Sequence, residues 1–86
     1  MNKMQVVIVA GGKGERLKPI TDKIPKPMVE VGGKSILEHI LNLFKKYDFA
    51  DFIFSLCYLP DVIINYFGDG SKFGVKISYT IENPDK

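Results

Sequence analysis

The chain has 86 residues, of which 45% are hydrophobic and 26% are charged, and its formal net charge is +2. This composition is that of one ordinary globular domain with a modest core. The net charge is too small to indicate nucleic-acid binding. Cys57 is the only cysteine, so an internal disulfide is excluded and we expect a small buried hydrophobic residue there.

The first strand is expected at Met4 to Ala10, a short run rich in β-branched residues that ends at glycines. Such a continuous apolar run predicts a strand buried on both faces, as in a parallel sheet. The run is too short to span a membrane and no cleavage-like site follows it, so we expect a cytoplasmic protein without a membrane partner.

A long connection follows from Gly11 to Gly33, because this stretch has no sustained period and contains three prolines. A loop of this length inside a compact domain is usually functional or disordered. The stretch Pro25-Lys26-Pro27 is expected to be extended, because the residue before a proline avoids the helical region. Residues 13 to 34 also carry a net charge of +3, which fits either a solvated loop or an anion site.

The second half of the chain alternates helices and strands. Ser35 and Glu38 predict a reciprocal capping box at the start of a helix that reaches Tyr47. We then expect a strand at Phe49 to Leu56, a short helix at Asp61 to Phe67, a turn at Gly68 to Ser71 and a strand at Val75 to Ile81.

The order strand, helix, strand, helix, strand predicts an α/β fold with a parallel sheet, one βαβαβ half of a doubly wound, Rossmann-like domain. Residues 1–86 are therefore assigned to a single nucleotide-binding part of a domain, and we expect the complete domain to carry more strands. A sheet edge left uncovered would favour self-association, which leaves a homo-oligomer possible.

Three glycines in four residues follow the first strand, at Gly11, Gly12 and Gly14, with Arg16 two residues further on. Glycines let backbone amides approach phosphate oxygens, and an arginine fork binds phosphate in a fixed geometry. The pattern favours a phosphate site over a simple turn. The dinucleotide motif fails because Leu17 stands at its third glycine, and the Walker A motif fails because Met28 stands at its first.

These residues resemble the signature of sugar-1-phosphate nucleotidyltransferases. The resemblance is carried by Val9 to Leu17, Pro25-Lys26-Pro27-Met28 and Val31 to Lys34, and it continues through Tyr66 to Ser71 and Ile77 to Glu82. It implies a nucleotidyltransferase fold and a magnesium-dependent reaction of a nucleoside triphosphate with a sugar 1-phosphate, giving a nucleoside diphosphate sugar and pyrophosphate.

The resemblance also implies roles for individual residues. Arg16 and Lys26 are the expected catalytic residues, Arg16 for the leaving pyrophosphate and Lys26 where the reacting phosphates meet. Glu82 matches a position that contacts the base. The expected nucleotide-binding residues are Ala10, Gly11, Gly12, Lys13, Gly14, Glu15, Arg16, Lys26 and Glu82. Magnesium ligands are expected beyond Lys86, so none is assigned here, and Asp22 and Asp69 are interpreted as loop and turn residues.

Two alternatives stay open. The chain belongs either to a catalytic enzyme, inactive as an isolated fragment, or to a non-catalytic regulatory or scaffold member of the same fold. Arg16 and Lys26 favour the first. A relative that transfers nucleotides to cofactor or lipid precursors fits the Pro-Lys-Pro-Met stretch less well. Neither the base nor the sugar follows from the sequence, although the stretch resembles guanylyl- and cytidylyl-transferring branches at least as much as thymidylyl ones.

Overall fold

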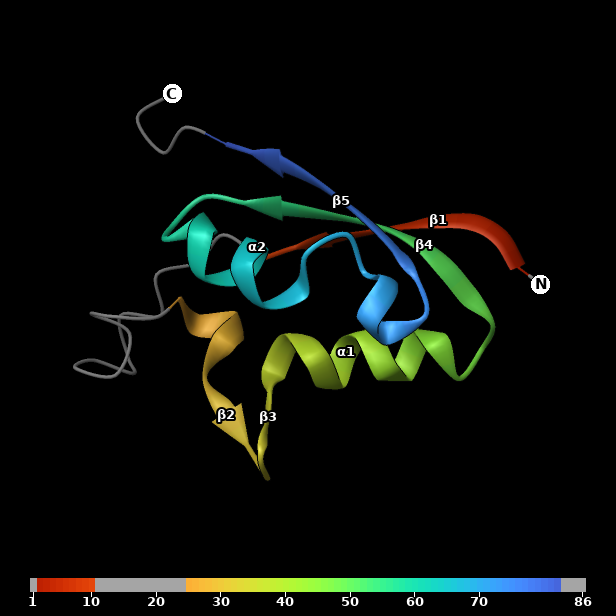
Figure 1. Cartoon of the computed structure of the whole chain (residues 1–86), viewed down its shortest axis with the longest axis horizontal. Coiled ribbons are helices and arrows are strands. Elements are labelled where there is room, and N and C mark those ends of the chain that lie inside the picture. The colour runs from red at the N-terminus through yellow and green to blue at the C-terminus, as the bar shows by residue number, and fades with distance from the viewer. Residues whose placement is uncertain (1, 11–24, 83–86) are drawn as a thin grey trace.

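A computed structural model describes residues 2–10 and 25–82 (Figure 1). The chain forms an α/β structure with parallel strands, as the sequence predicts. The elements in order are β1 (Asn2–Val9), the 3-10 turn η3 (Lys26–Met28), β2 (Glu30–Val31), β3 (Lys34–Ser35), α1 (Ile36–Lys45), β4 (Phe49–Leu56), α2 (Pro60–Phe67), the 3-10 turn η4 (Ser71–Phe73) and β5 (Lys76–Ile81).

The main sheet has the strand order β1-β4-β5, and both neighbouring pairs are parallel. The central strand β4 pairs Phe54 with Ile8 on one side and with Tyr79 on the other. All three strands therefore end at the same edge of the sheet. This arrangement confirms the predicted βαβαβ order and brings three strand-to-loop junctions together.

The core lies on one face of β4, where Phe52, Phe54 and Leu56 are fully buried. Phe44 of α1 packs edge-on against Phe52 with ring centroids 6.5 Å apart, and Phe67 of α2 packs against Phe54 at 5.3 Å. Residues two apart on a strand share a face, so both helices cover the same side of the sheet (Figure 1). Burial of each large side chain stabilises the fold by roughly 1.5–3 kcal/mol.

The opposite face of β1 is exposed, which contradicts the expectation of a strand buried on both faces. Val7 is 60% exposed and Val9 is 81% exposed, whereas Ala10 on the helical side is 3% exposed. The same apolar sequence fits a strand with one covered face and a strand with both faces covered. The difference arises because α1 and α2 lie on a single side, and no described element covers the other.

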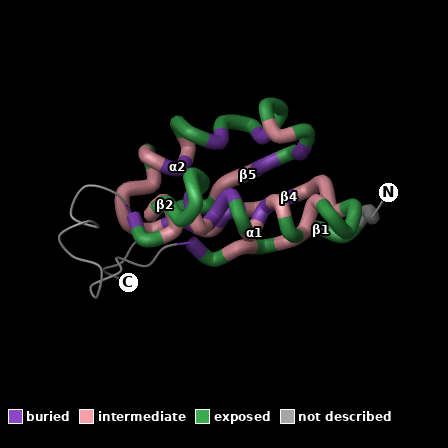
Figure 2. The backbone as a smooth tube through the Cα atoms, turned by 90° about the horizontal axis from the view of Figure 1, so that it is seen from below, coloured by how far each residue is buried: buried purple, intermediate pink, exposed green. Residues whose placement is uncertain are grey.

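The long loop expected from Gly11 to Gly33 is not irregular throughout. Within its described part, η3 is followed by the antiparallel hairpin β2–β3, which pairs Val31 with Lys34. Gly32 and Gly33 have φ values of 63° and 86°, the left-handed conformation that a two-residue type I′ turn requires. Residues 30–34 are exposed (Figure 2). Two adjacent glycines between short β-forming segments were a hairpin signal that the sequence interpretation overlooked.

The start of α1 shows half of the expected capping box. The Ser35 hydroxyl accepts a hydrogen bond of 3.1 Å from the Glu38 N–H, as predicted. The Glu38 carboxylate, however, accepts a hydrogen bond of 2.5 Å from the Tyr66 hydroxyl of α2. The reciprocal bond is therefore replaced by a hydrogen bond between the two helices.

Cys57, which the sequence predicts to be buried, is only half-buried. It directly follows the last residue of β4.

Candidate functional site

The carboxyl ends of the three parallel strands form one edge of the molecule. The Ala10 N–H donates to the Ser55 carbonyl at 2.8 Å, and the Glu82 N–H donates to the Leu56 carbonyl at 2.7 Å. The end of β4 is thereby held between the residue that follows β1 and the residue that follows β5. Ligands of open α/β sheets bind beyond this type of edge.

A hollow of about 280 Å³ opens beside the end of β1, between η3 and the first turns of α1. Most of its lining residues are apolar. It is lined by Ile8, Val9, Ala10, Lys26, Pro27, Ile36, Leu37 and Ile40. Among these residues Lys26 alone carries a charge. Low-polarity walls strengthen the attraction of an ammonium group for an anion, so the hollow favours a negatively charged ligand at its mouth.

The backbone of Lys26 is fixed by its neighbours. Pro25 is fully buried, and its carbonyl accepts a 2.9 Å hydrogen bond from the Met28 N–H. The Val29 N–H donates to the Lys26 carbonyl at 3.1 Å. The expected extended conformation is therefore correct only at Pro25, where ψ is 154°, because Lys26 and Pro27 enter the 3-10 turn. The fixed φ of proline suits the first turn of a helix equally well.

The hairpin that follows Lys26 is attached to α1 at both ends. The Ile36 N–H donates to the Val29 carbonyl at 3.0 Å, and His39 Nε2 donates to the Val31 carbonyl at 2.6 Å. The side chain of Lys26 is exposed, but its backbone belongs to a segment with few free torsions. The fixed backbone therefore limits the region that the Lys26 ammonium group can reach, although the side chain itself still has to be ordered when it binds a phosphate.

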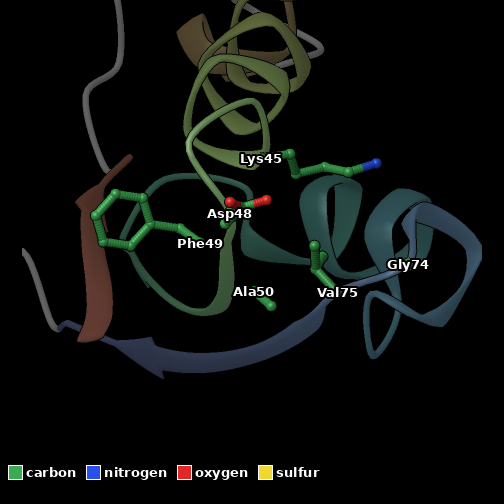
Figure 3. A pocket seen from close by; sticks show the side chains of 6 residues that line it. All are labelled: Lys45, Asp48, Phe49, Ala50, Gly74 and Val75. Carbon is green, nitrogen blue, oxygen red and sulfur yellow. The ribbon is translucent and has the colours of Figure 1, made fainter. Parts of the chain in front are cut away.

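A second hollow, of about 340 Å³, lies at the opposite edge of the sheet (Figure 3). It is lined by Lys45, Asp48, Phe49, Ala50, Gly74 and Val75. Phe49 and Ala50 begin β4, and Val75 directly precedes β5, so this hollow adjoins the amino ends of the strands. Although it is larger, its lining contains the carboxylate of Asp48 as well as the ammonium group of Lys45. We therefore assign the candidate site to the carboxyl edge, where Lys26 has no such acidic neighbour in the lining.

Three of the predicted site residues are described by the structure. Ala10 and Lys26 line the same hollow, whereas Glu82 is exposed at the end of β5, on the far side of β4. The remaining predicted residues, Gly11, Gly12, Lys13, Gly14, Glu15 and Arg16, lie outside the described residues. The structure thus brings two predicted residues together and places the third two strands away.

The sequence interpretation missed the connection between β4 and α2. Leu59 there has φ 48° and ψ 53°, a left-handed conformation that is rare for a branched side chain. The connection consists of Cys57, Tyr58 and Leu59. It lies between the strand ends that carry Ala10 and Glu82. No sequence signal encodes a left-handed leucine. The shortness of the connection was nevertheless visible and would have placed it at this edge.

Within residues 2–10 and 25–82, no group of three His, Cys, Asp or Glu side chains is placed to hold a metal ion. Asp69 accepts a 2.9 Å hydrogen bond from the Ser71 N–H, which confirms its interpretation as a turn residue. No helix in the same part of the chain is long and apolar enough to cross a membrane.

Comparison with known proteins identifies the group of enzymes that share this arrangement. A UTP–glucose-1-phosphate uridylyltransferase from Synechocystis is 40% identical over 79 residues, which are 92% of this chain and 20% of the relative. A D-glycero-alpha-D-manno-heptose 1-phosphate guanylyltransferase from Campylobacter jejuni is 43% identical over 92% of this chain and 35% of its own length. The chain thus spans about a fifth to a third of these relatives.

The solved structure of HddC from Yersinia pseudotuberculosis complexed with GMP-PN superimposes with a TM-score of 0.75 and 37% sequence identity. The superposition covers 91% of this chain and 35% of HddC. A profile of the family described as Nucleotidyl transferase matches residues 5–86. This match covers nearly the whole chain and includes all three strand ends of the candidate site. The chain therefore belongs to the nucleotidyl transferase family.

Proposed function

We propose that the protein containing this chain transfers a nucleoside monophosphate from a nucleoside triphosphate to a sugar 1-phosphate. The observation that carries the proposal is the apolar hollow at the end of β1, with Lys26 as its charged residue. Relatives named as uridylyl- and guanylyltransferases of sugar phosphates support the assignment of both substrates. The 86-residue chain by itself is expected to bind nucleotide and to catalyse nothing.

The reaction requires two anions to meet. A phosphate oxygen of the sugar 1-phosphate attacks the α-phosphorus, the bond from that phosphorus to the bridging oxygen breaks, and pyrophosphate leaves with the electron pair. Lys26 is proposed to neutralise charge where these groups meet, since Lys26 lines the hollow beside the end of β1. The fixed η3 backbone favours this role because alignment lowers the entropic part of the barrier.

The other proposed roles rest on residue chemistry. The amides of Gly11, Gly12, Lys13 and Gly14, with Ala10 and Glu15 beside them, would cradle the triphosphate. Arg16 would bind the leaving pyrophosphate through its planar fork. Glu82 would accept hydrogen bonds from the base, and its exposed position at the end of β5 leaves its carboxylate accessible.

Magnesium is proposed as the cofactor, with ligands outside the described residues. The described residues do not fit a metal site, because no three candidate ligands gather among them. A bound magnesium ion would offset phosphate charge and orient the triphosphate. The base and the sugar are left open, since the two relatives named above use different ones. We place the protein in the cytoplasm, without nucleic acid or membrane as a partner, and a homo-oligomer is compatible with the position of β1 as an outer strand of the described sheet.

A pyrophosphate-release assay tests this function. The natural protein that contains this sequence is given each common nucleoside triphosphate with a set of hexose and heptose 1-phosphates, with and without magnesium. Release that requires both substrates supports the proposal, and Arg16→Ala should reduce it by about 10- to 150-fold, the effect of losing one charge-assisted contact. Nucleotide binding without any release would instead assign the protein to a regulatory or scaffold role.

A further inference from the structure

The connection Cys57–Leu59 occupies the middle of the proposed nucleotide site, although none of its residues belongs to the predicted set. It follows β4, the central strand, and the neighbouring strand ends are bonded to it through Ala10 and Glu82. Adjacent strands lie about 4.8 Å apart, so the ends of β1 and β5 are separated by roughly 10 Å. A nucleotide with its phosphates over the end of β1 and its base at Glu82 must cross the end of β4.

The backbone of this connection is held in a costly conformation. A left-handed non-glycine residue is strained, and such strain persists only where the surrounding structure imposes it. Leu59 occupies the N-cap position of α2 but makes no side-chain capping hydrogen bond, so the helix end gains nothing from a leucine there. Its carbonyl accepts a 3.2 Å hydrogen bond from the Val62 N–H, and Pro60 fixes the next residue.

We propose that Cys57–Leu59 forms the floor beneath the nucleoside, and that the left-handed turn at Leu59 preorganises this floor. The inference rests on the proposed function, because it takes the phosphates to lie near Ala10 and the base near Glu82. The tight turn starts α2 after only three residues, so the connection stays short and lies directly at the end of β4. A preordered surface contributes affinity because less entropy is lost on binding.

The amide signals of this small chain provide a direct test. Labelled chain is titrated with UTP, GTP, CTP, ATP and dTTP, and separately with inorganic tripolyphosphate, which lacks the nucleoside. At least one nucleotide should shift the amides of Cys57, Tyr58 and Leu59 together with Ala10, and tripolyphosphate should shift Ala10 alone. If tripolyphosphate shifts the amides of Cys57–Leu59 as much as the nucleotide does, the inference is overturned. The segment would then respond to the phosphates and not to the nucleoside.

The same titration separates the two proposals. Shifts at Ala10 and Glu82 without shifts at Cys57–Leu59 would overturn the floor and leave the nucleotide site intact. No shift with any nucleotide would overturn the proposed nucleotide binding, and the inference with it.

A pair of glycine variants tests the preorganisation. Leu59→Gly still allows the left-handed turn but makes the backbone there more flexible. This variant should bind the best nucleotide about 3- to 10-fold more weakly. Its affinity for tripolyphosphate should be unchanged. The matched control is Asp48→Gly, because Asp48 is the other described non-glycine residue with positive φ and it lies at the opposite edge (Figure 3). Unchanged nucleotide affinity in Leu59→Gly, or an equal loss in Asp48→Gly, would overturn the preorganised floor.

Discussion

The hydroxyl of Tyr66 donates a hydrogen bond of 2.5 Å to the Glu38 carboxylate, which joins the last turn of α2 to the first turn of α1. Glu38 is 9% exposed, so its charge lies at the boundary of the core. The pKa of Tyr66 is raised above its usual value, first because its hydroxyl donates a hydrogen bond to Glu38 and then because of burial. The two helices that cover the sheet are thus tied at the end of α1 that follows the hairpin.

Replacing Tyr66 by phenylalanine should lower the free energy of unfolding by about 1 kcal/mol, since the ring is kept and one hydrogen bond to a charged group is lost. Urea unfolding followed by circular dichroism measures the change. Tyr47→Phe is the control, because Tyr47 is 64% exposed. An equal effect of the two substitutions would show that the bond from Tyr66 to Glu38 contributes nothing to stability.

The stability of the fold should fall with rising pH above about pH 10 because of Tyr79. Burial, with a smaller contribution from the Asp69 charge, raises the pKa of Tyr79 to about 12, and its hydroxyl donates to the Gly68 carbonyl at 2.6 Å. Because an unfolded tyrosine ionises near pH 10, this contribution is complete below that pH and is lost as the pH rises towards 12.

Unfolding free energies at pH 9, 10 and 11 are compared for the chain and for Tyr79→Phe. The decline should be shallower in Tyr79→Phe, which has no hydroxyl to ionise. Parallel pH profiles would contradict the assignment to Tyr79.

Two glycines in one turn should tolerate alanine very differently. A Cβ at Gly70 would meet the Val75 carbonyl oxygen at 2.7 Å and Ile77 Cγ1 at 2.8 Å, whereas a Cβ at Gly74 would meet nothing within 4 Å. Both have positive φ, so Gly74→Ala should cost about 1–2 kcal/mol from backbone strain alone. Gly70→Ala should cost roughly 1–3 kcal/mol more, because a buried backbone must move. Thermal unfolding of the two variants checks the difference, and equal midpoints would contradict it.

The sequence predicted the helices and strands well where apolar residues recur at a regular spacing. The strand Phe49–Leu56 has the expected bounds, and α2 begins one residue earlier than predicted because Pro60 takes the first helical position. The exposed face of β1 could not be predicted from its sequence, because it depends on which side of the sheet the helices occupy. The hydrogen bond that Tyr66 donates to Glu38 joins residues 28 positions apart, beyond the reach of a capping motif.

The candidate site was predictable to a similar extent. A lysine between two prolines, at a position that resembles a known signature, indicated Lys26, and the structure places it in a hollow with Ala10. Leu59 was not predictable, since a left-handed backbone is unfavourable for leucine and no local sequence preference indicates it. The roles proposed for residues 11–16 stay predictions.

Calorimetric titration of nucleoside triphosphate into the chain and two lysine variants tests the central claim most directly. Lys26→Ala should weaken binding about 10-fold or more, because one charge-assisted contact to phosphate is lost. Lys45→Ala removes the same charge from the hollow at the opposite edge of the sheet and should leave binding unchanged (Figure 3). Matching circular dichroism spectra establish that all three proteins are folded. Undiminished binding by Lys26→Ala, or an equal loss in Lys45→Ala, would contradict the placement of the nucleotide site at the carboxyl edge.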